Sequence, residues 1–205
     1  MPTPPPPAVY QLLGYPGTGK YTVARALVDR LEAGGATVRL IDNHLVANPV
    51  VSLVPAGEDG LIPEAAFDRV QAVRAEVMAT IGQFTPPSWS LVFTNYWVDG
   101  DRAAAHLAEV VALAERRGST FVPVLLRCDP DELVRRVVAP DRVARHKLVD
   151  PAGARRLLAE KLLRPPGTLA LDVTELAPAD AAERIVAYAA SWTANRGQAR
   201  SIIRE

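Results

Sequence analysis

A glycine-rich segment near the N-terminus, residues 14–20 (GYPGTGK), has the residue types and the spacing of a phosphate-binding loop. Four residues separate Gly14 from Gly19, and Lys20 follows directly. Glycines let backbone N–H groups turn inward around an anion, and the lysine reaches the terminal phosphates of a nucleotide. The segment therefore predicts a nucleotide site. Its expected ligands are Gly14, Tyr15, Pro16, Gly17, Thr18, Gly19, Lys20, Tyr21 and Thr22.

One position departs from this pattern. The residue after the lysine is normally serine or threonine, whose hydroxyl ligates Mg²⁺, but here it is Tyr21. A tyrosine hydroxyl lies too far from its Cα to take that role, and Thr22 is rotated by about 100° around the helix. Magnesium would then be held by water, by nucleotide oxygens and by another carboxylate, or it would be held weakly.

Strand-like and helix-like segments alternate along the chain, which is typical of a parallel sheet with crossover helices. Strands are predicted at 8–13, 37–42, 89–95, 120–127 and 168–173. Helices are predicted at 20–33, 63–84, 101–117, 130–138, 150–163 and 178–192. The stretch 43–61, which contains prolines and glycines, is expected to be a functional or mobile loop. The expected fold class is α/β, with helices on a five-stranded parallel sheet.

The composition fits one compact domain within 205 residues. Basic and acidic residues number 23 each, so neither nucleic acid nor a membrane is an expected partner. The single cysteine, Cys128, fits a reducing cytoplasm, and no apolar run approaches the roughly 20 residues of a membrane span. We expect a disordered proline-rich leader at 1–7, a domain at 8–192 and a frayed tail at 193–205.

With its phosphate loop between a strand and a helix, the chain resembles the small-molecule branch of the P-loop kinases. That branch includes shikimate kinase, gluconate kinase, chloramphenicol phosphotransferase and the nucleoside monophosphate kinases. The resemblance covers residues 9–188, and the phosphate loop is its only highly specific motif. It implies a three-layer P-loop NTPase fold with a small arginine-bearing lid. It also implies ATP and Mg²⁺ as cofactors and a small hydroxyl-bearing molecule as acceptor.

Members of this family carry an acidic residue at the end of the second strand, where this chain has Asp42. The resemblance implies that Asp42 orients or deprotonates the acceptor hydroxyl, or holds Mg²⁺ through water. The alternative is a plain aspartate in a turn at the strand end. Asn43 and His44 follow directly and are candidate substrate ligands, although a loop histidine hydrogen-bonded to backbone is an equal alternative.

The family also carries a mobile lid with arginines after the fourth strand. Here the lid is expected at 139–150, with Arg142 and Arg145 stabilising charge during phosphoryl transfer and His146 and Lys147 beside them. Arg136, on the preceding helix, is expected to face the nucleotide. Thr174 lies in a segment that resembles the loop bordering adenine. The alternative for the basic residues is a solvated helix and loop.

The third expected strand ends without the aspartate found in motor and GTPase engines. Its end reads Thr94-Asn95-Tyr96-Trp97, and the next acid is Asp99. This absence favours the kinase branch, in which the carboxylate of the second strand often serves instead. Tyr96, Trp97 and Asp99 are then candidate substrate ligands, with exposed aromatic rings suited to a ring-bearing or sugar-like acceptor. Packing residues are an equal alternative.

Three functions therefore stay open. The first is an ATP-dependent kinase that transfers the γ-phosphate to a hydroxyl of a small metabolite. The second is a nucleotide-binding module with weak or no catalysis, which Tyr21 favours. The third is a nucleotide or nucleoside kinase, which differs only in its acceptor pocket. Neither the acceptor nor the oligomeric state can be read from the sequence.

Overall fold

The computed structural model describes residues 5–55, 63–139 and 150–202. Within these residues one parallel sheet has the strand order β2-β3-β1-β4-β5. Its strands are β1 (Ala8–Leu13), β2 (Val38–Asp42), β3 (Ser90–Asn95), β4 (Thr120–Arg127) and β5 (Leu169–Asp172). The strand order changes direction at β1, so the segments after β1 and β3 diverge at the carboxyl edge, where ligands bind in such sheets.

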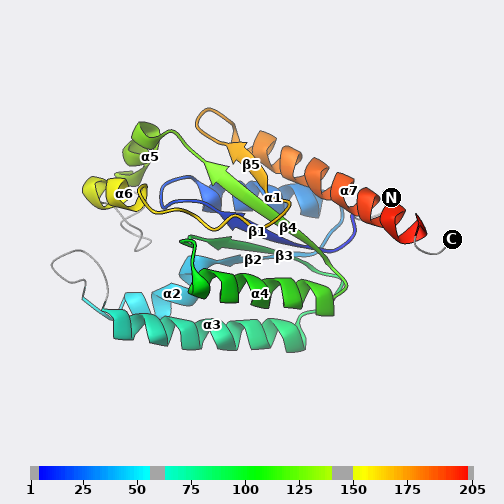
Figure 1. The fold of residues 1–205 in the computed structure, drawn as a ribbon, viewed down its shortest axis with the longest axis horizontal. Helices are drawn as coiled ribbons and strands as arrows, with labels where there is room; N and C mark the ends of the chain where they lie inside the picture. The colour runs from blue at the N-terminus through cyan, green and yellow to red at the C-terminus, as the bar shows by residue number, and fades with distance from the viewer. Residues whose placement is uncertain (1–4, 56–62, 140–149, 203–205) are drawn as a thin grey trace.

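Helices cover both faces of the sheet (Figure 1). They are α1 (Lys20–Ala33), α2 (Asn43–Val51), α3 (Glu64–Phe84), α4 (Asp101–Arg116), α5 (Pro130–Val137), α6 (Pro151–Leu157) and α7 (Pro178–Ile202). Helices α1 and α7 lie on one face and α3 and α4 on the other, while α5 and α6 lie beyond the carboxyl ends of the strands. The three-layer α/β fold expected from the sequence is therefore confirmed.

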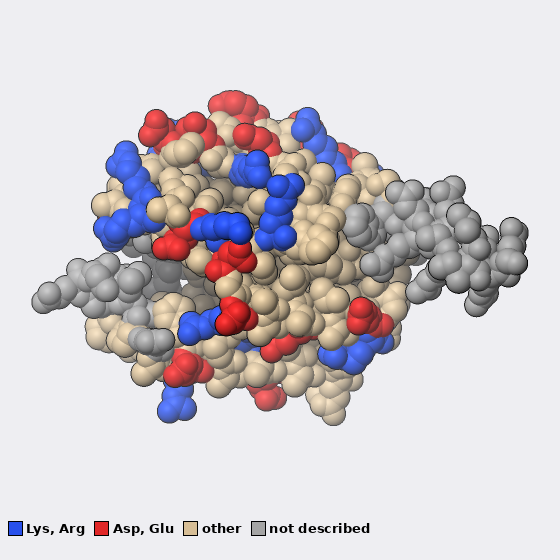
Figure 2. Space-filling view, viewed as in Figure 1, with Lys and Arg blue, Asp and Glu red and all other residues tan. Residues whose placement is uncertain are grey.

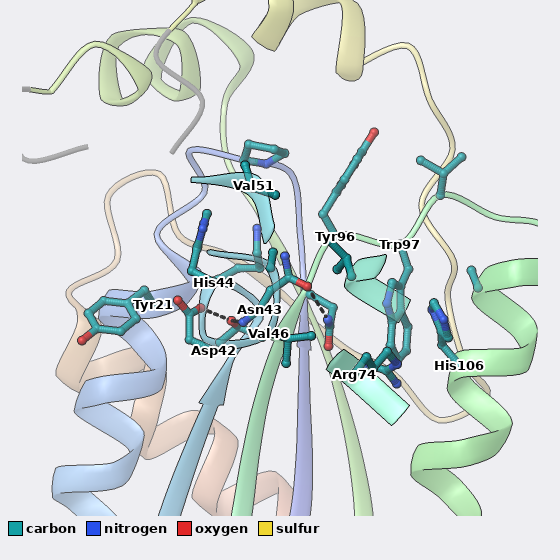
Figure 3. Close-up of a pocket in the computed structure, with 18 of the residues that line it drawn as sticks. Tyr21, Asp42, Asn43, His44, Val46, Val51, Arg74, Tyr96, Trp97 and His106 are labelled. Atoms are coloured by element: carbon teal, nitrogen blue, oxygen red, sulfur yellow. Dashed lines mark hydrogen bonds between the residues drawn. The ribbon is translucent and has the colours of Figure 1, made fainter. Parts of the chain in front are cut away.

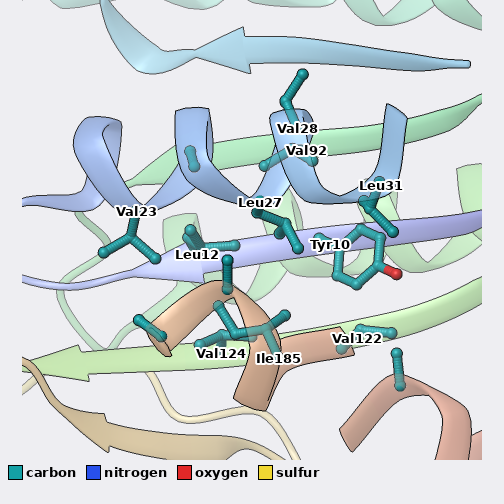
Figure 4. Close-up of a cluster of buried hydrophobic side chains, with 14 of the residues drawn as sticks. Tyr10, Leu12, Val23, Leu27, Val28, Leu31, Val92, Val122, Val124 and Ile185 are labelled. Carbon is teal, nitrogen blue, oxygen red and sulfur yellow. The ribbon is translucent and has the colours of Figure 1, made fainter. Parts of the chain in front are cut away.

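The central strand β1 has a core on each side because both of its faces are covered. Leu12 packs with Leu27 of α1, Val124 of β4 and Ile185 of α7 (Figure 4). The odd-numbered residues point to the other core, which α3 and α4 close; its members include Val9, Leu13, Leu91, Phe93, Val110 and Leu113. Burial of each large apolar side chain stabilises the fold by about 1.5–3 kcal/mol. Both cores hold the strand ends in fixed positions.

Helix α2 corrects the expectation of a loop at 43–61. Asn43–Val51 is helical, although Pro49 lies inside it. The helix is short, Val46 is its buried residue, and it packs mainly against α3, with further contacts to β2 and β3. The prolines that suggested a loop were therefore misleading for its first half.

Two other boundaries differ from the sequence prediction. Helix α6 ends at Leu157, earlier than predicted, and α7 continues to Ile202 through most of the expected tail. Among the described helices, none is both long and apolar enough to cross a bilayer. Figure 2 shows basic and acidic side chains interspersed over one face of the molecule, in keeping with a net charge of zero.

Candidate functional site

The phosphate loop is shaped by glycines that no other residue could replace without strain. Gly17 and Gly19 have φ angles of 99° and 89°, in the left-handed region. A Cβ atom on Gly17 would also lie 2.9 Å from a methyl group of Val137 and 3.1 Å from the backbone oxygen of Leu133. Gly17 therefore allows α5 to pack directly on the loop. Gly19 is the N-cap of α1, which directs the positive end of this helix at the loop.

The Lys20 side chain lies back against this loop. Its Nζ donates hydrogen bonds to the carbonyl oxygens of Gly14 (2.7 Å) and Tyr15 (2.9 Å). Thr18 holds the same turn, since its Oγ1 donates to the Tyr15 carbonyl at 2.9 Å. An ammonium group, a helix N-terminus and the loop backbone thus converge at one place, which is the arrangement that binds phosphates.

A cavity of about 1140 Å³ extends from the phosphate loop across the carboxyl ends of β2 and β3. Of the residues predicted as ligands, it is lined by Pro16, Gly17, Gly19, Lys20, Tyr21, Thr22, Asp42, Asn43, His44, Tyr96, Trp97, Asp99 and Arg136. The structure thus brings the predicted nucleotide side and the predicted substrate side together in one space. Its volume lies just above the range of roughly 300–1,000 Å³ that is typical of a pocket for one small ligand.

A hydrogen-bonded group of side chains forms the floor of this cavity; we call Gln11, Asp42, Asn43, Thr94 and Asn95 the polar floor. The Thr94 hydroxyl donates to the Asp42 carboxylate and accepts from the Asn43 backbone N–H at 3.2 Å. Asn95 donates to Asn43 Oδ1 at 3.1 Å, and Gln11 donates to Asn95 Oδ1 at 2.9 Å. The floor fixes the Asp42 carboxylate from below and leaves it facing the cavity (Figure 3).

Sequence reasoning missed three members of the floor. Gln11, Thr94 and Asn95 are buried at the middle and the end of strands that are otherwise apolar. A polar side chain inside such a strand needs a partner, which was the signal that could have found them.

His44 lies at the first turn of α2 and lines the cavity beside Asp42 (Figure 3). Its Nδ1 is 3.2 Å from Asn48 Oδ1, one turn along the helix. A side-chain partner orients the ring, and the residue lies in a helix rather than in the expected loop. The contact leaves His44 in a position to meet a ligand.

The far side of the cavity carries aromatic and basic groups; we call Arg74, Tyr96, Trp97 and His106 the aromatic wall. Trp97 is only 7% exposed and belongs to the core under α3 and α4, so it is a packing residue, as the alternative expectation had it, and it also lines the cavity. The Tyr96 ring is tilted against that of Tyr15, with centroids 6.1 Å apart. Burial, with smaller effects from Glu160 and Tyr15, raises the pKa of Tyr96 to about 12, so its hydroxyl keeps its proton.

Two residues of this wall had not been foreseen. Arg74 of α3 has its Cζ 5.7 Å from the centre of the Trp97 ring. The centre of the His106 ring, on α4, lies 5.9 Å from the centre of the same Trp97 ring. Burial lowers the pKa of His106, and the charge of Arg74 lowers it further. An arginine at core spacing between Val70 and Val77 was the available signal.

Asp99 lies at the rim of this wall and is already paired. Its carboxylate accepts from Lys161 Nζ at 2.7 Å, and its backbone N–H donates to the Lys161 carbonyl at 2.8 Å. The Leu163 N–H donates to the Trp97 carbonyl at 2.9 Å. The chain after α6 thus holds the segment after β3, which carries Tyr96 and Trp97 of the aromatic wall.

Arg136 connects the phosphate loop to the segment after β5. Its Nη2 donates to the carbonyl oxygens of Val173 (3.1 Å) and Thr174 (2.6 Å), while Glu132 accepts from its Nε at 2.7 Å. A Cβ on Gly19 would lie 3.9 Å from Arg136 Nη1, so the guanidinium borders the loop. Thr174 lies next to the site through this backbone contact rather than along the cavity lining. The predicted lid residues Arg142, Arg145, His146 and Lys147 lie outside the described residues.

The described residues offer little for a metal. No group of three or more histidine, cysteine or acidic side chains could hold an ion in that part of the chain. Tyr21 points away from Tyr96 and Trp97 (Figure 3) and also lines a second groove with Arg25, Leu40 and Pro49. Asp42, which lines the cavity, is the residue predicted to hold Mg²⁺ through water.

Solved kinase structures share this fold. An APS kinase from Mycobacterium tuberculosis, in complex with AMPPNP and APS, matches with a TM-score of 0.57 at 16% identity, over 90% of this chain and 98% of that one. A gluconokinase from Sinorhizobium meliloti gives 0.55 at 19% identity over 92% and 95% of the two chains. The chain has the fold of the P-loop small-molecule kinases.

A shikimate kinase from Acinetobacter baumannii, in complex with shikimate, gives a TM-score of 0.52 at 20% identity over 88% of this chain and 91% of that one. The expected resemblance to P-loop small-molecule kinases is therefore confirmed at the level of the fold. No protein-family model and no curated protein matches the sequence.

Proposed function

We propose that the protein is an ATP-dependent kinase that transfers the γ-phosphate to a hydroxyl of a small metabolite. The observation that carries this proposal is the single cavity that joins Lys20 and the phosphate loop to Asp42 and the aromatic wall. Phosphoryl transfer depends on placing two ligands in line and on stabilising charge, and a shared cavity can do both.

In this proposal the loop amides and Lys20 bind the β- and γ-phosphates. Lys20 exchanges its two carbonyl partners for phosphate oxygens, which are stronger acceptors because they are charged. Asp42 receives and orients the acceptor hydroxyl from the polar floor, with Asn43 and His44 beside it. Arg136 borders the nucleotide, and Thr174 borders its base through backbone.

Arg142 and Arg145 complete the proposal as lid residues that neutralise charge at the transferred phosphoryl group and exclude water. Asp42 would hold Mg²⁺ through water, and the ion would supply charge stabilisation during phosphoryl transfer. The acceptor is a small molecule in the space beside Tyr96 and Trp97, with Asp99 at its rim. Neither nucleic acid nor a membrane is part of this proposal, and the cytoplasm is the proposed compartment.

A second candidate is a nucleotide-binding module with weak or no catalysis. Tyr21 favours it because it replaces the hydroxyl that would ligate Mg²⁺. Steady ATP turnover stimulated by one acceptor would exclude this candidate. Nucleotide binding without turnover across a broad acceptor panel would support it.

The first experiment is a thermal-shift panel of nucleoside triphosphates with and without Mg²⁺. A ligand at about 100 times its Kd adds roughly 2.7 kcal/mol to the free energy of unfolding, which Lys20→Ala should largely remove. Arg116→Ala, which removes an exposed charge from the far end of α4, is the matched control and should keep the shift. The nucleotide site is refuted if no triphosphate stabilises the wild type or if Lys20→Ala is stabilised equally.

The second experiment measures ADP release with a panel of acceptors. Gluconate, shikimate, adenosine phosphosulfate and nucleosides represent the acceptor types of similar folds and of the third open function. The proposal predicts that one acceptor class raises ADP release well above the rate with water alone. Nucleosides as the best class would make the protein a nucleoside kinase.

A further inference from the structure

Arg74 is a charged residue in a core position. It lies on α3 with Val70 and Val77 on the same stripe, is 7% exposed, and lines the cavity beneath Trp97 (Figure 3). The roles proposed above for the phosphate loop, Asp42 and the lid do not use it.

The internal partners of Arg74 are weak. Its Nη2 is 3.5 Å from Glu109 Oε2, the long limit of a hydrogen bond, and the Glu109 side chain is 55% exposed to screening solvent. The Cζ atom of Arg74 lies 5.7 Å from the centre of the Trp97 ring, which gives a cation–π contact. At that distance the ring does not accept a hydrogen bond from the guanidinium. In the part of the chain that the structure describes, Nε is buried and has no hydrogen-bond partner.

A buried guanidinium with an unmade hydrogen bond is destabilising, because burial removes water that nothing replaces. Burial accordingly lowers the pKa of Arg74, against the opposing effect of Glu109. An oxyanion that entered the cavity would supply the charge that Arg74 lacks, and an acceptor for the part of the guanidinium that lines the cavity; the fully buried Nε lies beyond its reach. Such a ligand would gain more here than at an exposed arginine, since less solvent screens the contact.

The surroundings of Arg74 define the rest of this ligand. Besides the polar residues Gln71, Asp101 and Arg102, the cavity is lined by the apolar Val46, Val70 and Ala103 and by the Trp97 ring. A small ring or carbon chain would fit against these residues. Toward the phosphate loop the same cavity reaches Asp42, the proposed partner of the acceptor hydroxyl.

We propose that Arg74 binds an oxyanion group of the acceptor, so that the acceptor is a small hydroxylated molecule with a carboxylate, phosphate or sulfate at its other end. This inference rests on the proposed kinase function for the identity of the ligand as acceptor. The oxyanion site itself is defined by Arg74 and the aromatic wall and can be tested without turnover.

The test uses four probes that share a phenyl ring: benzoate, phenyl phosphate, phenyl sulfate and uncharged benzamide. Binding is followed by the fluorescence of Trp97 in a Trp89→Phe/Trp192→Phe variant, in which Trp97 is the only tryptophan left of three. At least one anion should bind about tenfold or more tightly than benzamide, in line with a hydrogen bond to a charged group. The preferred anion identifies the head group.

Two variants locate the effect at Arg74. Arg74→Gln should remove the preference for the anion, whereas Arg69→Gln, an exposed arginine on the same helix, should retain it. Glu109→Gln changes an exposed side chain and should tighten anion binding, because it removes the competing carboxylate. This second variant keeps the test decisive if Arg74→Gln does not fold.

The inference is overturned if the Trp89→Phe/Trp192→Phe protein, with Arg74 intact, binds none of the three anions more tightly than benzamide. It is overturned as well if Glu109→Gln leaves the affinity for the anion unchanged. It is also overturned if Arg69→Gln loses the preference as fully as Arg74→Gln. Efficient turnover of an uncharged acceptor, unaffected by Arg74→Gln, would refute this inference and keep the kinase function. A clear anion preference without any nucleotide binding would refute the kinase function and keep the oxyanion site.

Discussion

The phosphate loop and the aromatic wall are two ends of one cavity, and their polar groups are held in different ways. The loop is local, since residues 14–20 supply both its shape and its charge. The wall is assembled from α3, α4 and the segment after β3, so its residues meet only after folding. A local site can be recognised from spacing, whereas an assembled site must be recognised from polar residues in apolar surroundings.

The largest expected effect concerns Asp42, which lies between the two ends. Asp42→Asn keeps the hydrogen bond from Thr94 possible but removes the negative charge that would orient and accept the proton of an acceptor hydroxyl. We expect turnover to fall about 10²–10⁴-fold, the range typical of a lost general base. The thermal shift given by nucleotide should stay, because the phosphate loop is unchanged.

Steady-state kinetics with the best acceptor measures this effect. Comparison with Lys20→Ala separates the two ends of the cavity, since that variant should lose nucleotide stabilisation as well. Equal loss of nucleotide binding in both variants would show that Asp42 belongs to the nucleotide side instead.

The next effect tests how tightly the loop shape is fixed. Gly17→Ala places a Cβ at a φ of 99° and against Val137 and the backbone of α5, so we expect a loss of about 1–3 kcal/mol in the free energy of unfolding. Gly82→Ala is the matched control, because Gly82 lies inside α3 with open space around it. It should stabilise the protein by about 0.5–1 kcal/mol.

Urea unfolding of both variants gives these values. A Gly17→Ala protein as stable as the wild type would mean that α5 moves aside easily. The loop would then be less constrained than its glycine conformations indicate.

The sequence predicted the local features and missed the assembled ones. The five strands, α1 and the phosphate loop follow from apolar segments and glycine spacing, and the structure has them. Helix α2 was missed because Pro49 argues against a helix, while its packing through Val46 is a tertiary effect. Arg74 and Gln11 were missed because an apolar pattern hides single polar residues whose partners lie far along the chain.

A smaller effect tests the polar floor from below. Gln11 is 0% exposed, and Gln11→Leu would leave Asn95 Oδ1 without its donor. We expect a loss of about 1 kcal/mol in the free energy of unfolding, because the lost hydrogen bond is partly offset by removing the unpaired Gln11 Oε1. The KM for the acceptor should rise, since Asn95 and Asn43 lose their fixed orientation.

Tyr10→Phe is the control for this substitution. Tyr10 neighbours Gln11 on β1 but faces the core under α1 and α7 (Figure 4), so it should not alter the KM for the acceptor. An unchanged KM in Gln11→Leu would show that the floor supports the fold without orienting the acceptor.

The smallest effect is a pH dependence at the aromatic wall. Burial and the charge of Arg74 lower the pKa of His106 below its ordinary 6.5; Arg102 acts in the same direction and Glu109 opposes it. The unfolded chain therefore binds the His106 proton at a higher pH than the folded protein does. The neutral His106 therefore contributes to the free energy of unfolding. This contribution is complete above about pH 6.5 and declines as the pH falls through that value toward the lowered pKa.

Urea unfolding of the wild type and His106→Gln across this range isolates the effect, because the other titrating groups are common to both proteins. The stability difference between them should change in favour of the variant as the pH falls. A difference independent of pH would mean that His106 titrates as it does in the unfolded chain.

The anion preferred by the aromatic wall should weaken this pH dependence of stability, because a negative charge beside Arg74 offsets the positive field that helps to keep His106 neutral. The two ends of the cavity then differ in a further respect, since nucleotide at the phosphate loop should leave this pH dependence nearly unchanged.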